Sequence, residues 1–351
     1  MSAPVTISID AMGGDNAPNI VVEGVRLAHV RLPHVRYLLC GDTARIEPLL
    51  DRHPEMRGVC TLRHTDEAVS GDAKPSQVLR TGRRSSMWLA ADAVAKGEAA
   101  GVVSAGNTGA LMAVSKFVLR MLPGIDRPAI AGMFPTERGE TVVLDLGANV
   151  DCDANNLVQF AVMGEVFARA VLGLEQPSIG LLNVGSEELK GNDAVRTAAN
   201  TLRESHLPIR FHGFVEGNDI CAGTVDVVVA DGFTGNIALK TAEGTVRLYS
   251  TFLKESFGNS VLARIGYLFA KQALQKVKVR TDPRRYNGAM FLGLNGIAVK
   301  SHGGTDAFGF AHAIGVAVDL VPHGYNDRIR RELERFKAAE PAPTQRAAGT
   351  G

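Results

Sequence analysis

Ile-Ser-Ile-Asp-Ala-Met-Gly-Gly-Asp-Asn-Ala-Pro, residues 7–18, joins an alternating apolar strand to the start of a helix. The alternation over residues 5–9 predicts the strand, and the apolar spacing over residues 20–28 predicts the helix. Two glycines in the loop allow backbone angles and close approaches that a Cβ forbids. A helix N-terminus behind such a loop gathers N–H groups around an anion. The stretch therefore predicts an anion site, although an ordinary strand–helix turn has the same pattern.

Five further apolar runs end in a short loop of small and polar residues, as the first one does. They span residues 99–104, 141–144, 178–183, 225–229 and 296–300. Strands that alternate with helices favour an α/β protein with three α/β/α layers, Rossmann-like, around a mostly parallel sheet. Ligands of such sheets bind beyond the carboxyl ends of the strands. We therefore expect the six polar strand ends to share one cleft.

Composition indicates an ordinary soluble globular protein. Its 351 residues are 45% hydrophobic and 21% charged, with a formal net charge of +1. This balance gives no general nucleic-acid footprint, and no apolar run is long enough to span a membrane. The four cysteines are scattered without zinc-ligand spacing, so we expect reduced thiols, no metal and a cytoplasmic location. We expect a single domain over residues 1–337 and a disordered tail over residues 338–351.

A basic amphipathic helical segment is expected at about residues 245–286. Between Lys254 and Arg285, eight basic residues stand against Glu255 and Asp282, which gives a charge of +6. This segment is either a core-packed or dimer-packed helix with a solvated basic face, or a surface for a membrane or an acidic partner. The residues expected to make the membrane or carrier-protein contact are Arg264, Ile265, Leu268, Phe269 and Lys271.

Several ordered motifs carry a family resemblance that covers roughly residues 4–325. They are residues 7–18, Ser-Ser-Met (85–87), Val-Ser-Ala-Gly-Asn-Thr-Gly-Ala-Leu-Met (103–112), Asp-Leu-Gly-Ala-Asn-Val-Asp (145–151), Leu-Leu-Asn-Val-Gly-Ser-Glu-Glu-Leu-Lys-Gly-Asn (181–192), Val-Val-Ala-Asp-Gly-Phe-Thr-Gly-Asn-Ile-Ala-Leu-Lys (228–240) and Lys-Ser-His-Gly (300–303). In this order they resemble the bacterial phosphate acyltransferases, the acyl-carrier-protein–phosphate transacylases of phospholipid synthesis. One departure is Arg84, where the family usually has an acidic residue before Ser-Ser-Met.

The resemblance implies a reaction and its partners. It implies transfer of a long-chain fatty acyl group from acyl-carrier protein to inorganic phosphate, without a cofactor, giving acyl phosphate for phosphatidic acid synthesis. It also implies a fold related to the phosphate acetyltransferases and isocitrate dehydrogenase, and a homodimer. The implied location is cytoplasmic, with peripheral attachment to an anionic membrane surface. A membrane glycerol-3-phosphate acyltransferase that uses acyl phosphate is a further implied partner.

This chemistry needs a seat for phosphate and donors for the tetrahedral oxyanion more than it needs a strong base, because phosphate is already an anion. The expected catalytic residues are Lys190, Asn107, His302, Asp231 and Lys240. The expected substrate- and phosphate-binding residues are Asp10, Gly13, Gly14, Asn16, Ser104, Gly106, Thr108, Gly109, Asn149, Asn192, Gly235 and Asn236. The loop over residues 104–109 is the preferred phosphate pocket. For Asp10, Asp145 and Asp231, capping of the following helices is an equally good interpretation, as is a structural role for His302.

Motifs of other catalytic and nucleotide-binding sites fit the sequence poorly. A P-loop motif, a spaced dinucleotide glycine motif and a hydrolase nucleophile elbow are all missing from the sequence. The pair Asp151 and Asp153 is too small a set to predict a metal site. Two alternative functions stay open at this point: a dehydrogenase on a related fold, which would bind a nicotinamide and a divalent metal, and a non-catalytic membrane scaffold for lipid synthesis.

Overall fold

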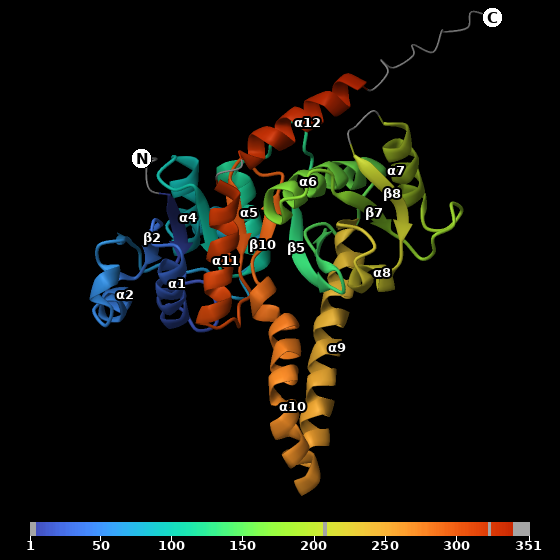
Figure 1. The fold of residues 1–351 in the computed structure, drawn as a ribbon. Helices are drawn as coiled ribbons and strands as arrows, with labels where there is room; N and C mark the ends of the chain where they lie inside the picture. The colour runs from blue at the N-terminus through green and yellow to red at the C-terminus, as the bar shows by residue number, and fades with distance from the viewer. Residues whose placement is uncertain (1–4, 206–208, 322–323, 340–351) are drawn as a thin grey trace, which may run out of the picture.

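An 11-stranded sheet runs through the whole computed structural model, which describes residues 5–205, 209–321 and 324–339 (Figure 1). The strands lie in the order β3-β2-β1-β4-β11-β10-β5-β6-β9-β7-β8. Their bounds are β1 (Thr6–Asp10), β2 (Arg36–Gly41), β3 (Cys60–His64), β4 (Gly101–Ser104), β5 (Ala129–Thr136), β6 (Gly139–Leu144), β7 (Ser178–Leu182), β8 (Arg210–Val215), β9 (Val227–Val229), β10 (Ala289–Leu292) and β11 (Ile297–Lys300).

Helices cover both faces of the sheet, so the predicted three-layer α/β fold is confirmed. One core cluster packs the sheet against α1 (Asn19–Arg31), α2 (Thr43–Leu50), α6 (Ala154–Leu172), α7 (Asp193–Glu204), α11 (Ala307–Leu320) and α12 (Tyr325–Ala339). The other cluster packs the opposite face against α3 (Pro75–Thr81), α4 (Ser86–Ala95), α5 (Thr108–Leu119), α8 (Gly217–Ala222) and the first turns of α9 (Gly232–Gly258). Two short 3₁₀ helices span Pro54–Met56 and Pro283–Tyr286.

The central strands are buried because they are apolar along their length. Ile7 and Ile9 of β1 are fully buried, and β9 is a run of three buried valines. Burying a side chain of this size contributes about 1.5–3 kcal/mol. A strand covered on both faces by helices reads as a continuous apolar run, which is why these segments could be recognised from the sequence.

Three antiparallel contacts divide the sheet into two halves of opposite direction. Strand β10 runs antiparallel to both β11 and β5, and β5 runs antiparallel to β6. The remaining neighbours are parallel, which confirms a mostly parallel sheet. Strands β1, β4 and β11 therefore end at one edge, here called the first edge, and β6, β7 and β9 end at the opposite, second edge. The expectation that all six strand ends share one cleft is wrong for this reason.

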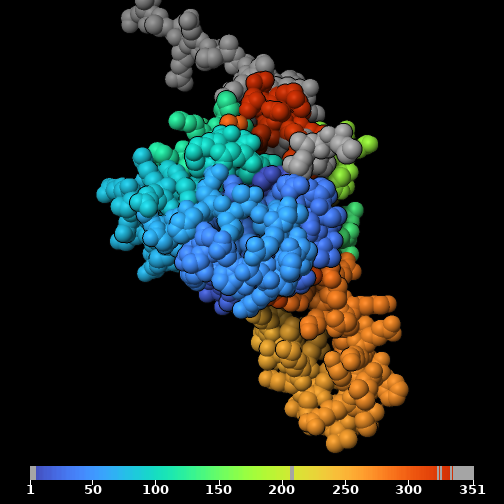
Figure 2. Space-filling model, turned by 90° about the vertical axis from the view of Figure 1, so that its left-hand side faces the viewer, coloured from blue at the N-terminus to red at the C-terminus, as the bar shows by residue number. Residues whose placement is uncertain are grey.

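Helices α9 and α10 (Val261–Arg280) form an antiparallel hairpin that projects from the body of the protein (Figures 1 and 2). The two helices meet near the tip, where the rings of Phe257 and Tyr267 pack edge to face 5.5 Å apart. No residue of α10 is buried, and Leu268 and Phe269 are 69% and 86% exposed. The segment expected at residues 245–286 is thus helical through Arg280 except at the turn formed by Asn259 and Ser260, and most of its large apolar side chains are exposed.

The C-terminal helix α12 extends to Ala339, so the first two residues of the expected tail are helical. Residues 340–351, the rest of that tail, lie outside the described part of the chain. Within the described residues, no helix combines the length and the apolar character that a membrane span requires.

Candidate active site

Asp10 is the centre of a buried polar cluster at the first edge. The Ser86 hydroxyl donates to its Oδ1 and the Ser104 hydroxyl to its Oδ2, both at 2.6 Å. Burial raises the pKa of Asp10, and the two serine hydrogen bonds act in the opposite direction. The residue does not cap a helix, because the residue preceding α1 is Pro18. Asp10 instead ties β1 to β4 and to the start of α4.

The loop after β1 lies against this cluster too closely for a side chain. A Cβ on Gly13 would lie 2.4 Å from Oδ2 of Asp10 and 2.8 Å from the backbone nitrogen of Gly106. Gly14 has a φ of +105°, a left-handed value that favours glycine. The backbone N–H of Asp15 donates to the carbonyl of Gly303 at 3.0 Å. Three loops from distant parts of the sequence therefore meet at this edge, as the sequence predicted for Gly13, Gly14 and Gly106.

Helix α5 points its N-terminus into the same region. Oδ1 of Asn107 caps the helix by accepting from the N–H of Ala110 at 2.8 Å, and its Nδ2 donates to the carbonyl of Gly71 at 2.6 Å. The first N–H groups of an α-helix, here at Thr108 and Gly109, have no partner inside the helix and carry the positive end of its dipole. Asn107 thus holds the helix end in place, and the backbone beside it can receive an anion.

Lys300, which the sequence analysis did not select, supplies a buried cation at this edge. It ends β11 with 9% of its surface exposed, and its Nζ donates to the carbonyls of Ala105, at 3.4 Å, and Ser301. Burial lowers the pKa of Lys300 to about 8, against the attraction of Asp10 and Asp15 and with repulsion from Lys240. Its place at the end of an apolar run, inside the motif Lys-Ser-His-Gly, was the available signal.

The other expected residues of the first edge are more exposed. His302 is exposed. Its ring Nδ1 accepts from the backbone N–H of Gly304 at 3.2 Å, and its backbone N–H donates to Oδ1 of Asn287 at 2.9 Å. Lys240 lies on α9 and pairs with Glu243 at 3.0 Å. Its charge acts to lower the pKa of Lys300. Asn16 is exposed in the loop after β1.

Asp145 organises a second polar cluster at the second edge. Its Oδ1 accepts N–H bonds from Ile130 at 2.9 Å, Gly147 at 3.2 Å and Ala148 at 3.0 Å. Its Oδ2 accepts from the backbone and side-chain nitrogens of Asn149, at 2.7 and 2.9 Å. Burial raises the pKa of Asp145 in spite of these bonds. It does not cap α6, whose N-cap is Asp153, so its contacts are those of a loop organiser.

The start of α9 packs directly on this loop. The N–H of Gly232 donates to the carbonyl of Asn149 at 2.7 Å, and a Cβ on Gly235 would lie 2.0 Å from the carbonyl oxygen of Asp145. The side chain of Asn236 faces Gly147. Asp231 caps α9 through the N–H of Thr234 at 2.8 Å, as the capping interpretation predicted. These residues are brought together, but at the edge opposite Asp10.

Lys190 and Asn192 are placed far from Asn107. They follow β7, which is six strands from β4, about 29 Å across a sheet with the usual strand spacing. Lys190 is exposed, and Asn192 caps α7 through the N–H of Val195 at 2.9 Å. The expected joint use of Lys190 and Asn107 at one phosphate therefore conflicts with the direction of β7.

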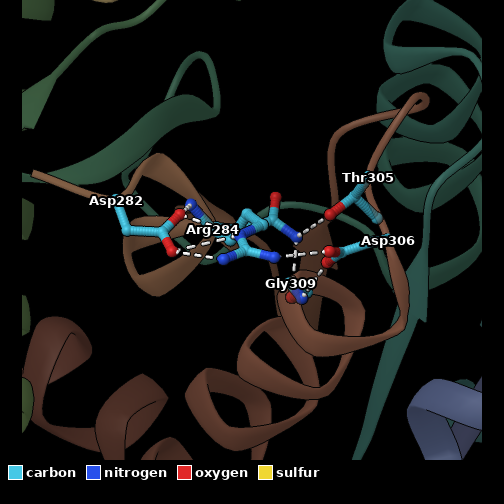
Figure 3. Close-up of polar contacts among 6 residues, drawn as sticks. Asp282, Arg284, Thr305, Asp306 and Gly309 are labelled. Atoms are coloured by element: carbon cyan, nitrogen blue, oxygen red, sulfur yellow. Dashed lines mark hydrogen bonds and ion pairs between the residues drawn. The ribbon is translucent and has the colours of Figure 1, made fainter. Parts of the chain in front are cut away.

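Arg284 fastens the foot of the hairpin to the start of α11 (Figure 3). Its guanidinium binds Asp282, with a shortest contact of 2.6 Å, and reaches Asp306 at 2.7 Å. Asp306 in turn caps α11 through the N–H of Gly309 at 3.0 Å. The hairpin is therefore anchored to the helix that follows the Lys-Ser-His-Gly loop.

Among the described residues, no group of three or more His, Cys, Asp or Glu side chains could hold a metal ion. Cys40 is buried, Cys60 and Cys152 are partly buried, and Cys221 is exposed. Burial raises the pKa of Cys40, Cys60 and Cys152 to about 12. A thiol with so high a pKa is a poor nucleophile at neutral pH.

Comparison with known proteins finds similar sequences that agree with one another in family. A family model described as "Fatty acid synthesis protein" matches residues 5–328. The phosphate acyltransferase of Paramagnetospirillum magneticum is 80% identical over 350 residues, which cover 100% of both chains. That of Rhodospirillum centenum is 67% identical over 339 residues, covering 97% of this chain and 96% of the relative.

Solved structures share the fold at low identity. A phosphotransacetylase from Streptococcus pyogenes superposes with a TM-score of 0.58 at 15% identity, over 92% of this chain and 95% of the other. A protein described as a putative 4-hydroxythreonine-4-phosphate dehydrogenase from Salmonella typhimurium gives 0.56 at 14% identity, over 90% and 99%. At such identities the likeness concerns the fold alone.

Proposed function

Because the chain belongs to the phosphate acyltransferase family, we propose that it transfers a long-chain fatty acyl group from acyl-carrier protein to inorganic phosphate. The product is an acyl phosphate that serves phosphatidic acid synthesis. Membership of this family favours acyl transfer over the dehydrogenase and scaffold alternatives. The single observation that carries the proposal is the buried Lys300 beside the N-terminus of α5 at the first edge.

Phosphate is seated at this edge by backbone and by positive charge. The N–H groups at the start of α5 and of the loop after β1 offer donors, as helix N-termini commonly do for anions. Lys300 and Lys240 contribute positive charge, and burial of Lys300 strengthens its field because little water screens it. Asp10 and Ser104 hold the loops at the required spacing. The seat therefore positions the nucleophile without a strong base.

The reaction is a direct displacement at the thioester carbonyl. A phosphate oxygen forms the C–O bond and pushes the carbonyl electrons onto its oxygen; collapse of this oxyanion breaks the C–S bond. The leaving thiolate has a free pKa near ~8.5, so it departs with little help and takes a proton at neutral pH. We assign the donation of that proton to His302, which is exposed at the same edge. Loss of one oxyanion donor typically costs roughly 10²–10³ in rate.

The α9–α10 hairpin is the proposed contact with other molecules. Leu248, Tyr249 and Phe252 on α9 are 54–60% exposed, which suits pairing with a second copy of the chain through the same patch. Near the tip, Ile265, Leu268 and Phe269 are exposed beside Arg264 and Lys271, which suits an anionic membrane surface. A cytoplasmic enzyme attached in this way would release acyl phosphate beside a membrane acyltransferase.

The test is incubation of the purified chain with a defined acyl-carrier protein and labelled phosphate, with acyl-coenzyme A in parallel. Labelled acyl phosphate from the carrier-bound donor is the expected result. The Asn107→Ala variant, checked for unchanged unfolding temperature, should form it more slowly, because the start of α5 is no longer held. No acyl phosphate from either donor would disprove the proposed function.

A further inference from the structure

A groove of about 840 Å³ lies on the α5 side of the sheet, outside the two polar clusters except for its border at Asn149. Its volume is within the range of about 300–1,000 Å³ found for small-molecule sites. It is lined by Leu79, Met112, Ala113, Lys116, Phe117, Arg120, Met121, Arg127, Pro128 and Asn149. Four of these ten residues come from α5, at the helical spacing 112, 113, 116 and 117, and two more directly follow the helix, so the groove runs along α5.

The wall of the groove is apolar and open. Leu79, Met112 and Met121 line it, together with Phe117, which is 54% exposed. The Phe117 ring packs against Trp88 at 5.5 Å, and the guanidinium carbon of Arg83 lies 5.8 Å from its centroid, so the ring is held in place. A fixed and exposed aromatic ring in a groove is a surface that a ligand can cover.

Three cations lie at the end of the groove farther from Asn107. They are Lys116, Arg120 and Arg127, and none of the described residues that line the groove is a carboxylate. Within residues 5–205, 209–321 and 324–339, none of the three makes an ion pair. Arg127 donates to a backbone carbonyl, that of Asp151, at 3.2 Å. Arginine matches the geometry of phosphate oxygens, so this end is complementary to a phosphate-bearing ligand.

Arg120 is also held in an unusual backbone conformation. Its φ is +65°, the only positive value among the described residues other than glycine. The carbonyl of Arg120 accepts from the N–H of Asn295 at 2.9 Å, which fixes this turn at the end of α5. Non-glycine residues in this region cluster at ligand-binding sites. The side chain is therefore presented from a rigid point.

The length of α5 relates the cations to the proposed phosphate seat. Arg120 follows Asn107 by 13 residues, about 20 Å along a helix axis. An extended chain equivalent to roughly five or six residues covers that distance. The phosphopantetheine arm of a carrier-bound thioester is a chain of this length, with a phosphodiester at one end and the thioester at the other.

We propose that the groove binds the phosphopantetheine arm of the acyl donor. Its stem lies along Met112 and Phe117, and its phosphodiester binds Arg120 with Lys116 and Arg127. The thioester then reaches the N-terminus of α5, where phosphate attacks. This inference rests on the proposed function and adds the site of the donor arm to it.

The experiment compares two carrier-free donors, palmitoyl-4′-phosphopantetheine and palmitoyl-pantetheine, which differ only in the phosphate. For the wild-type protein the phosphorylated donor should have the higher kcat/KM. Arg120→Gln removes the positive charge, keeps a polar side chain and should reduce this preference roughly 10- to 100-fold, the effect of one charge-assisted hydrogen bond. Arg52→Gln, an exposed arginine outside the groove, is the matched control and should keep the wild-type preference.

A second variant tests whether the stem of the phosphopantetheine arm lies in the groove. Ala113→Trp should slow both donors by filling the groove, whereas Ala44→Trp on the exposed face of α2 should slow neither. An unchanged donor preference in Arg120→Gln would overturn the inference, as would slowing confined to carrier-bound palmitate, which would assign Arg120 to the carrier surface. If the wild-type protein forms acyl phosphate from no donor, the proposed function fails first.

Discussion

The Ser104 hydroxyl donates to the carboxylate of Asp10 across 2.6 Å, joining the ends of two neighbouring strands from residues 94 positions apart. Ser86 adds a second bond of the same length to the other oxygen. Because Gly13 and Gly106 pack against these groups, the pair sets the distance between the first loop and the start of α5. Lys300 ends β11, which is the neighbour of β4 in the sheet. The arrangement leads to predictions that separate stability from catalysis.

Lys300→Met should strongly lower activity without loss of stability. The folded pKa of about 8 lies below the value of an unfolded lysine, so at pH 7 the unfolded chain holds this proton more tightly. The buried charge therefore lowers the free energy of unfolding below pH 8, and a neutral side chain of similar length removes that cost. We expect a rate lower by roughly 10²–10³. Thermal unfolding at pH 7 should show a Tm no lower than wild type; a clear fall would contradict this.

The pH dependence of the reaction should have an alkaline limb. As pH rises through about 8, Lys300 loses its proton and its charge. We expect kcat/KM for phosphate to fall above pH 8 in steady-state assays. A profile that is flat to pH 9.5 would separate Lys300 from phosphate binding.

Gly13→Ala should be costly for its size. The added Cβ would lie 2.4 Å from Oδ2 of Asp10, so the loop must move. Overpacking of this kind costs about 1–3 kcal/mol. Gly58→Ala is the control, because nothing lies within 4 Å of its Cβ. Urea unfolding of both variants measures the difference, and equal midpoints would show that the loop has room.

Asp145→Asn should destabilise the protein even though the side chain keeps its shape. One carboxylate oxygen becomes an NH₂ group, yet both oxygens accept N–H donors in the structure. Each buried donor left without an acceptor costs about 1–3 kcal/mol. Asp151→Asn, on an exposed residue nearby, is the control. Comparable unfolding free energies for the two variants, measured in urea, would argue against the organising role of Asp145.

The double variant Ile265→Glu/Leu268→Glu should abolish sedimentation with anionic vesicles. Both side chains are exposed on the hairpin, and burial of an aliphatic side chain contributes about 1.5–3 kcal/mol. Binding by the wild-type protein should persist at raised salt if these residues insert. Arg264→Gln/Lys271→Gln should instead weaken binding mainly at low salt. Unchanged sedimentation of the glutamate variant would rule out insertion.

The sequence alone was sufficient to predict features that depend on residues close together along the chain. Apolar runs identified β1, β4, β6, β7, β9 and β11 but not β2, β3, β5, β8 and β10. The polar loops supplied helix caps such as Asn107, Asn192 and Asp231. The first loop was placed correctly against residues 104–106 because glycine spacing and strand ends are local signals. The long amphipathic helices were recognised from their periodicity.

Features that depend on non-local pairing could not be read in the same way. Nothing in the composition of β10 or β6 reveals that each runs antiparallel to β5, so Lys190 was assigned to the wrong edge. The burial of Lys300 follows from packing between β11 and β4, which lie far apart in the sequence. The same holds for Asp10, whose partners Ser86 and Ser104 become neighbours only when the sheet forms.

The position of β10 and β11 has a consequence for biosynthesis. They leave the ribosome after the hairpin, yet they lie in the middle of the sheet, between β4 and β5. Until then, the backbone N–H and C=O groups along one side of β4 and one side of β5 have no strand partner. Such unpaired strands are templates for incorrect association. Chains that terminate before Ala289 therefore lack the centre of the molecule, and we expect such products to be cleared by proteolysis or to aggregate.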